Sequence, residues 1–168
     1  MSYTDQLLDL NRAYAARFQK GHLSHRPTRP VAVVICMDSR IDVHRSLGLE
    51  EGEVHVIRNA GGVVTEDVIR SLLISQRQLG TREIMVVHHT NCGMLTFTDD
   101  GLKRQVQAEV GIRPPFALEA FPDLDEDVRQ SIARIQASPF VPHKASVRGF
   151  VYDVDTGRLR EVSATAAR

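Results

Sequence analysis

The sequence predicts an α/β fold with a single domain, in which helices flank a central, mostly parallel β-sheet. Three short segments, residues 31–35, 53–57 and 84–87, have the length and the β-branched content of strands. Amphipathic helical patterns lie between and after these segments. Alternating strands and helices are typical of right-handed parallel crossovers. We therefore expect one domain over residues 1–168, with its ligand chemistry at the carboxyl ends of the strands.

The chain opens with an amphipathic helix. Apolar residues recur at steps of three and four from Tyr3 to Phe18, with Ser2 or Thr4 as the expected cap and Gly21 as the expected stop. We expect its aromatic stripe to cover either the sheet or a partner subunit.

The remaining elements follow from periodicity and from end signals. Three more helices are expected. The first should start at Thr65 or Glu66 and stop at Gly80, and the second should start at Asp99 or Asp100 and stop at Gly111. The third should start at Asp123, paired with Glu126, and stop at Pro139. Residues 41–51 should form a short helix or loop, and residues 112–122 an irregular loop. Residues 146–154 and 159–162 should form a last strand and a short edge strand.

Composition limits the function classes. The chain has 168 residues, 42% of them hydrophobic and 25% charged, which suits one domain with a real core. Lys+Arg and Asp+Glu are equal at 21 each, so neither nucleic acid nor an acidic membrane surface is an expected partner. No apolar run approaches the roughly 18 residues of a membrane helix. Two cysteines without an export pattern favour a reducing compartment, so we expect a cytoplasmic protein.

Candidate metal ligands follow two of the predicted strands. Cys36 comes directly after the first apolar strand, Cys92 follows the third, and His89 lies three residues before Cys92. Two thiolates and an imidazole, with Asp38 nearby, make a plausible tetrahedral set that favours zinc over calcium, magnesium or manganese. Ligands from the ends of different strands indicate a catalytic metal at a sheet crevice.

Other interpretations of these residues stay open. The two cysteines would also suit buried apolar positions or a disulfide. Asp38 and Arg40 would also suit a surface ion pair of little energy, although beside a divalent cation their charges are hard to treat as incidental. We expect His88 to face away from the ligands and to pack or hydrogen-bond there. The paired glycines at 61 and 62 form either an ordinary tight turn or a wall of the site.

Three stretches together resemble the signature of the β-class carbonic anhydrases. They are Cys-Met-Asp-Ser-Arg from Cys36, Arg-Asn-Ala-Gly-Gly from Arg58 and His-Thr-Asn-Cys-Gly from His89. The order and spacings agree, and the likeness extends from the N-terminal helix to the strand near the C-terminus. The resemblance implies a mostly parallel α/β sheet in a homodimer or homotetramer, with the N-terminal helix laid across the partner subunit.

The resemblance also implies roles for single residues. The expected Zn2+ ligands are Cys36, His89 and Cys92, the expected catalytic dyad is Asp38 and Arg40, and the expected substrate-pocket residues are Gly93 and Gly62. In this dyad the arginine draws the carboxylate off the metal; in a closed state Asp38 itself becomes the fourth zinc ligand. The positions that depart from common members are Met37, Gly62, His88 and Asn91, and none of them is a ligand.

The implied activity is the reversible hydration of CO2 to bicarbonate and a proton. A zinc-bound hydroxide attacks CO2, Asp38 orients the hydroxide, and the strand ends with Phe116 or Phe121 form a dry pocket. Competition between Asp38 and hydroxide predicts a rate that rises under alkaline conditions. Two alternatives are a hydrolase of carbonyl sulfide or carbon disulfide, and a zinc- or bicarbonate-binding domain without turnover. No nucleotide-binding glycine motif occurs.

Overall fold

The computed structural model describes residues 2–163, whose strands form one sheet in the order β2-β1-β3-β4-β5. The strands are β1 (Val31–Cys36), β2 (His55–Asn59), β3 (Glu83–His89), β4 (Val147–Tyr152) and β5 (Leu159–Val162). The first four strands pair in parallel, and β5 pairs antiparallel with β4 at one edge. This arrangement confirms the expected α/β fold with a mostly parallel sheet.

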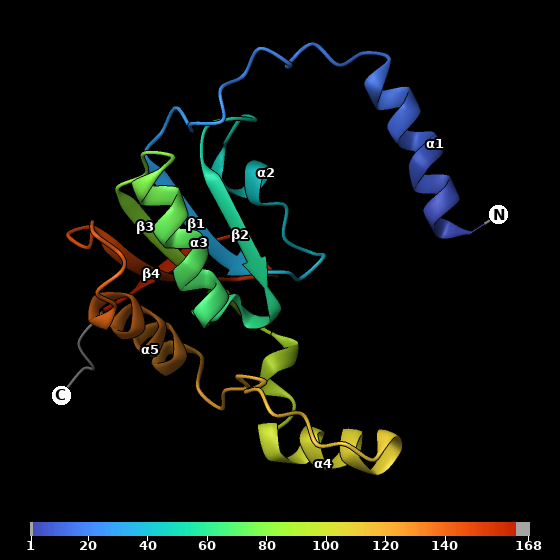
Figure 1. The fold of residues 1–168 in the computed structure, drawn as a ribbon, viewed down its shortest axis with the longest axis vertical. Helices are drawn as coiled ribbons and strands as arrows, with labels where there is room; N and C mark the ends of the chain where they lie inside the picture. Colours follow the sequence, from blue (N-terminus) through green and yellow to red (C-terminus); the bar gives the residue numbers. More distant parts are fainter. Residues whose placement is uncertain (1, 164–168) are drawn as a thin grey trace.

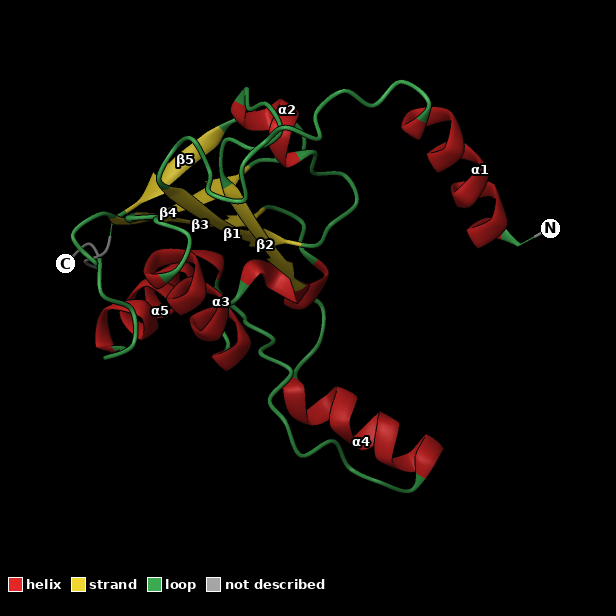
Figure 2. Ribbon diagram, turned by 45° about the horizontal axis from the view of Figure 1, so that its top comes forward, coloured by secondary structure: helices red, strands yellow, loops and turns green. Residues whose placement is uncertain are grey.

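Helices cover both faces of the sheet. The helices of the described chain are α1 (Tyr3–Ala15), α2 (Val43–Leu47), α3 (Glu66–Arg77), α4 (Asp99–Val110) and α5 (Leu124–Ala137), and the single 3-10 turns are η1 (Ala60–Gly62) and η2 (Gly93–Leu95). Figure 2 shows α3 and α5 against one face and α2 on the other. Among residues 2–163, no helix combines the length and the hydropathy that a bilayer crossing requires.

The two faces of β1 and β3 supply two apolar cores. On the side of α3 and α5, alternate strand residues pack against helix residues; this cluster includes Ala32, Val34, Ile84, Val86, Val68, Leu72 and Ile135. The opposite cluster includes Val33, Ile35, Val87, Ile41 and Val43. Because successive side chains of a strand point to opposite faces, a strand covered on both faces is apolar at every position. This explains the unbroken apolar run that the sequence carries in β1.

Helix ends agree only partly with the expected signals. Ser2 caps α1 in a reciprocal capping box with Asp5, and Thr65 caps α3. The expected helix end near Gly21 is wrong, because α1 ends at Ala15 and the amides of Arg17 and Phe18 bond to carbonyls three residues back. The amphipathic pattern up to Phe18 therefore outlasts the helix.

The expected cap of the helix over residues 99–110 is also wrong. Thr98 caps α4, since its hydroxyl accepts from the amide of Gly101. The carboxylate of Asp99 accepts instead from the amides of Leu118 and Ala120 and so holds the irregular loop after the helix. The Asp99 carboxylate, which the local sequence would assign to the helix amides, thus accepts from a distant backbone segment.

The α1 helix does not cover the sheet of its own chain. Figure 1 shows it projecting away from the body, and none of its residues is buried. Of the two surfaces considered for its aromatic stripe, the sheet is therefore wrong, and only the partner subunit remains as a prediction.

The paired glycines lie against the ends of two strands. Gly61 and Gly62 have positive φ values of 82° and 72° within the turn η1. A Cβ added to Gly62 would lie 2.8 Å from the carbonyl oxygen of Val87 and 2.9 Å from the amide nitrogen of Cys36. The turn therefore requires glycine at this position for two reasons, its dihedral angles and its close approach to the backbone of β1 and β3.

We predict that Gly62→Ala lowers the free energy of unfolding by about 3 kcal/mol or more, because a left-handed conformation and a backbone clash are combined. Gly80→Ala is the matched control: its φ is 85°, but no atom lies within 4 Å of the added Cβ. This control should lose only about 1 kcal/mol. Denaturant unfolding measures both values, and equal losses would show that the close approach is not a constraint.

Candidate metal centre

Cys36, His89 and Cys92 come together at the carboxyl edge of the sheet. Their ligand atoms all lie within 4.8 Å of one another, and all three residues are buried. The cause is topological: β1 and β3 are parallel neighbours, so the end of one and the turn after the other meet at the same edge. Cys92 lies just beyond β3 and before η2, so its approach to His89 comes from a turn rather than from one helical turn.

The imidazole of His89 is oriented for metal ligation. Its Nδ1 lies 2.8 Å from the carbonyl oxygen of Thr90. A carbonyl only accepts hydrogen bonds, so in the neutral imidazole Nδ1 carries the proton and Nε2 keeps a free lone pair. That Nε2 is buried and has no hydrogen-bond partner. A buried lone pair that faces two thiol groups fits a soft metal ion such as zinc, and a carbonyl behind the other nitrogen is the usual support for such a ligand.

The two cysteines ionise unequally. Hydrogen bonding by the neighbouring Cys92 thiol lowers the pKa of Cys36, against the effect of burial. Its hydrogen bond to Cys36 and its own burial raise the pKa of Cys92 above the usual value. The pair thus gives up its first proton easily and holds its second, and a zinc ion would displace that second proton. Both cysteines are free, so the disulfide alternative is wrong.

Asp38 and Arg40 form a two-point ion pair beside this cluster. Arg40 donates from Nε to Oδ1 of Asp38 at 2.9 Å and from Nη2 to Oδ2 at 2.8 Å. These hydrogen bonds hold the pKa of Asp38 well below its usual range. The same Nη2 donates to the carbonyl oxygen of Asn91 at 3.0 Å, which links the two ligand-bearing segments. Oδ2 of Asp38 lies 3.7 Å from Nε2 of His89.

The other expected site residues surround the cluster unevenly. Gly93 is exposed, with open space where a side chain would be, whereas Gly62 is buried behind the strand ends. Phe121 is buried in an apolar cluster with both cysteines and Met94. Phe116 is 63% exposed and lies outside that cluster.

His88 points away from the ligands, as expected. Its Nε2 lies 2.7 Å from Oδ2 of Asp127 on α5, and both side chains are buried. Sequence analysis assigns no role to Asp127 or to Thr90. A carboxylate on the buried stripe of α5, beside Val128, was the available signal that a buried polar partner exists. No comparable signal marks Thr90, because every residue carries a backbone carbonyl.

Comparisons with known proteins agree with this site. The carbonic anhydrase family model matches residues 31–114. A β-carbonic anhydrase 1 of Mycobacterium tuberculosis is 60% identical over 163 residues, which cover 97% of this chain and 99% of that protein. The chain belongs to the β-carbonic anhydrase family. The matched segment of the family model contains all three candidate ligands and the Asp38–Arg40 pair.

Two further relatives show the range of this family. The crystal structure of a carbonic anhydrase from Streptococcus mutans superposes with a TM-score of 0.91 at 46% identity and covers 97% of this chain and 99% of its own. A carbon disulfide hydrolase from Acidianus is 34% identical over 184 residues, which cover 95% of this chain and 88% of that protein. β-Carbonic anhydrase-like chains therefore include proteins named for two different substrates.

We predict that Cys92→Ser lowers zinc affinity by on the order of 100-fold, because a hydroxyl replaces a thiolate that zinc prefers. Zinc per chain, measured by elemental analysis after dialysis, gives the readout. Met37→Ser is the matched control, since it removes a 65% exposed sulfur next to Cys36 without touching a ligand, and it should keep its zinc. A Cys92→Ser protein that retains a full equivalent of zinc would refute the ligand assignment.

Proposed function

We propose that this protein catalyses the reversible hydration of CO2 to bicarbonate and a proton, with a zinc ion held by Cys36, His89 and Cys92. The observation that carries the proposal is the buried, unpartnered Nε2 of His89 facing two thiols, in a chain of the β-carbonic anhydrase family. Two cysteines and one histidine leave one tetrahedral position for a water or a substrate, which is the arrangement of a catalytic zinc site.

The protein groups around the ligands have separate tasks. A zinc ion held by this set would lower the pKa of a bound water towards about 7 and so would supply hydroxide at neutral pH. Asp38 accepts a hydrogen bond from the nucleophile and turns its lone pair towards CO2. Arg40 holds the Asp38 carboxylate by two nitrogens and keeps it ionised.

The walls of the pocket are apolar on one side and open on the other. Phe121 and Met94, packed against the two cysteines, exclude water behind the ligands. Gly93 lies beside Cys92 on the open side, and we place CO2 next to its amide. Gly62 closes the buried side, where its lack of a side chain lets the turn approach Cys36. A small, linear, apolar substrate suits such walls.

The same ion pair provides a gate. Because Oδ2 of Asp38 lies 3.7 Å from Nε2 of His89, a rotation of this carboxylate would take it from Arg40 to the fourth zinc position. In that position Asp38 would close the site and would compete there with hydroxide. The competition favours hydroxide as pH rises, so we expect activity to increase from neutral to alkaline pH.

We predict that Asp38→Ala keeps its zinc but loses turnover by about 100-fold, the usual contribution of a positioned proton acceptor. Stopped-flow CO2 hydration between pH 7 and 9 measures it. The pKa of Asp38 lies far below this window, so the rising rate of the native protein reports hydroxide rather than Asp38 ionisation. Asp42→Ala, which removes a nearby carboxylate that caps α2 and pairs with Arg45, should stay within about twofold. An unchanged Asp38→Ala rate would remove Asp38 from the mechanism.

A second candidate function is hydrolysis of carbon disulfide or carbonyl sulfide at the same site. The observation in its favour is the 34% identity to a carbon disulfide hydrolase over most of the chain. Both compounds are linear and have the same valence-electron count as CO2, so the geometry at the metal would serve all three. Sulfide release from each compound, compared with CO2 hydration on the same zinc-loaded sample, discriminates them. Full zinc occupancy without any turnover would favour a zinc- or bicarbonate-binding domain.

We also propose that the protein is a homodimer or homotetramer in which α1 packs on a partner subunit. The supporting observation is an exposed apolar stripe along one side of the N-terminal segment, made of Tyr3, Leu7, Leu10, Tyr14 and Phe18. A helix that buries no residue gains little stability by itself in water. The linker of residues 16–30 spans up to about 50 Å when extended, enough to reach a second copy.

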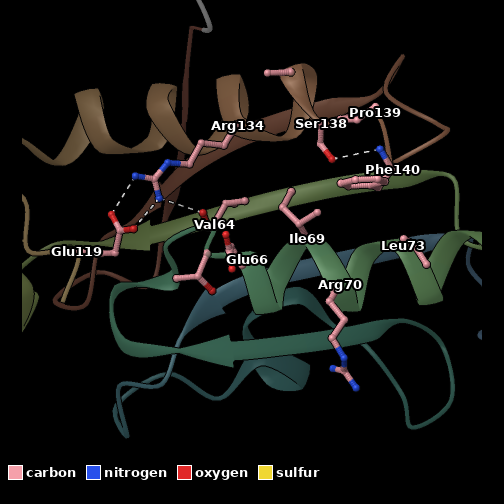
Figure 3. A pocket seen from close by; sticks show the side chains of 12 residues that line it. Val64, Glu66, Ile69, Arg70, Leu73, Glu119, Arg134, Ser138, Pro139 and Phe140 are labelled. Atoms are coloured by element: carbon pink, nitrogen blue, oxygen red, sulfur yellow. Dashed lines mark hydrogen bonds and ion pairs between the residues drawn. The ribbon is translucent and has the colours of Figure 1, made fainter. Parts of the chain in front are cut away.

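A groove between α3 and α5 is the surface we propose for the partner's α1. It has a volume of about 780 Å³. Figure 3 shows Ile69 and Leu73 of α3 facing Phe140 across the groove, with Arg134 and Glu119 paired at one end. An amphipathic helix laid into an apolar groove is a common recognition mode.

We further propose one domain over residues 1–168 and a cytoplasmic location, since two free cysteines suit a reducing compartment.

We predict that Leu10→Asp weakens self-association by at least tenfold, because it puts a charge in the middle of the apolar stripe. Sedimentation equilibrium measures the dissociation constant. The control is Asn11→Asp, which adds the same charge one residue later on another side of α1. Equal behaviour of the two variants would show that the stripe is not an interface.

A further inference from the structure

Arg58 reaches from the edge strand to the backbone that follows β1. It lies on β2, next to Ile35 in the strand register. Its Nε donates to the carbonyl oxygen of Cys36 at 2.9 Å, its Nη2 to that of Asp38 at 2.7 Å and its Nη1 to that of Ile41 at 3.1 Å. All three nitrogens of one guanidinium are therefore engaged with main-chain carbonyls of a single short segment.

This segment leaves the sheet while it carries two groups of the metal centre. β1 ends at Cys36, and the amide of Met37 still donates to the carbonyl of Asn59 at 2.8 Å. After that, the amide of Ile41 bonds back to the carbonyl of Asp38 at 3.1 Å and closes a turn. No ladder of a neighbouring strand holds the turn, so its position depends on side chains that reach it.

The two arginines beside the centre act on different parts of Asp38. Arg40 donates to the carboxylate of Asp38, whereas Arg58 donates to its carbonyl oxygen. The carboxylate can rotate without moving the backbone, but a shift of the backbone would move Asp38 and the Cys36 sulfur together. Sub-ångström placement of such groups governs both metal affinity and turnover.

We propose that Arg58 is a positioning residue of the metal centre: its guanidinium fixes the backbone of residues 36–41 so that the sulfur of Cys36 meets His89. This inference rests on the proposed zinc-dependent function. The planar fork of a guanidinium presents several donors in fixed directions, which matches three converging carbonyls. An ammonium is a single point with free rotation, so a lysine at this position would hold fewer of these carbonyls in place.

The experiment compares Arg58→Ala and Arg58→Lys with the native protein. The control is Arg148→Ala, which removes an exposed guanidinium that pairs with Glu161 at the far edge of the sheet. Four quantities are measured: the rate of zinc release to a chelator, CO2 hydration per bound zinc, the visible spectrum of the cobalt-substituted protein, and the melting temperature. Each assay is repeated with about 50 mM guanidinium chloride, well below the molar concentrations that unfold proteins, because Arg58 is solvent-exposed and its site stays accessible.

Arg58→Ala should release zinc at least tenfold faster and hydrate CO2 at least tenfold more slowly per bound zinc, the usual size of effect for groups that support metal ligands. Its cobalt spectrum should shift, Arg58→Lys should fall between it and the native protein, and guanidinium should restore part of each loss in Arg58→Ala alone. Arg148→Ala should match the native protein in every readout except the melting temperature.

Two results would overturn the proposal. One is native zinc release, turnover and cobalt spectrum in Arg58→Ala. The other is a lower melting temperature in that variant with unchanged turnover per bound zinc and no response to guanidinium, which would mean a purely structural role. If Arg58→Ala does not fold, Arg58→Lys decides on the same readouts. A native protein that binds no zinc would instead refute the proposed function, so the two failures are distinguishable.

Discussion

Parallel pairing of β1 with β3 is the constraint on which the metal centre depends. The two strands are neighbours in the sheet and run in the same direction, so the end of β1 and the turn after β3 share one edge. Cys36 thereby meets His89 and Cys92, although the two ligand segments are distant in the sequence. Apolar packing on both faces fixes the strands, and the Gly62 turn allows the close approach at their ends. The packing of the sheet therefore determines the arrangement of the three candidate ligands before a metal ion binds.

A set of hydrogen bonds then refines what the sheet places. The Thr90 carbonyl determines the tautomer of His89, and Arg40 holds the carboxylate of Asp38. Arg58 holds the backbone of Asp38. Each of these groups acts on a different atom, and none of them needs to be a metal ligand. The arrangement explains how an exposed loop keeps the precision that a metal centre requires, because charge-assisted hydrogen bonds replace the strand ladder that ends at Cys36.

Local patterns were sufficient to predict the sheet, most helices and the three residues that cluster as candidate ligands. The strands have strong apolar runs, Thr65 and Asp123 are effective caps, and the two cysteines each follow a strand. Apart from the early end of α1, the features that sequence reasoning missed depend on contacts between distant segments. The Asp127–His88 bond, the Arg58 fork and the loop held by Asp99 join residues that no local periodicity relates. The surface that receives α1 was beyond reach for a further reason, since we place it on another chain.

The dependence of CO2 hydration on zinc content tests the proposed zinc-dependent function most directly. Protein stripped of metal is reloaded to known fractions of one zinc per chain, and initial hydration rates are measured at alkaline pH. We predict a rate proportional to bound zinc that reaches its maximum at one equivalent held by Cys36, His89 and Cys92. A rate that does not depend on zinc, or a fully loaded protein without turnover at any pH, would contradict it.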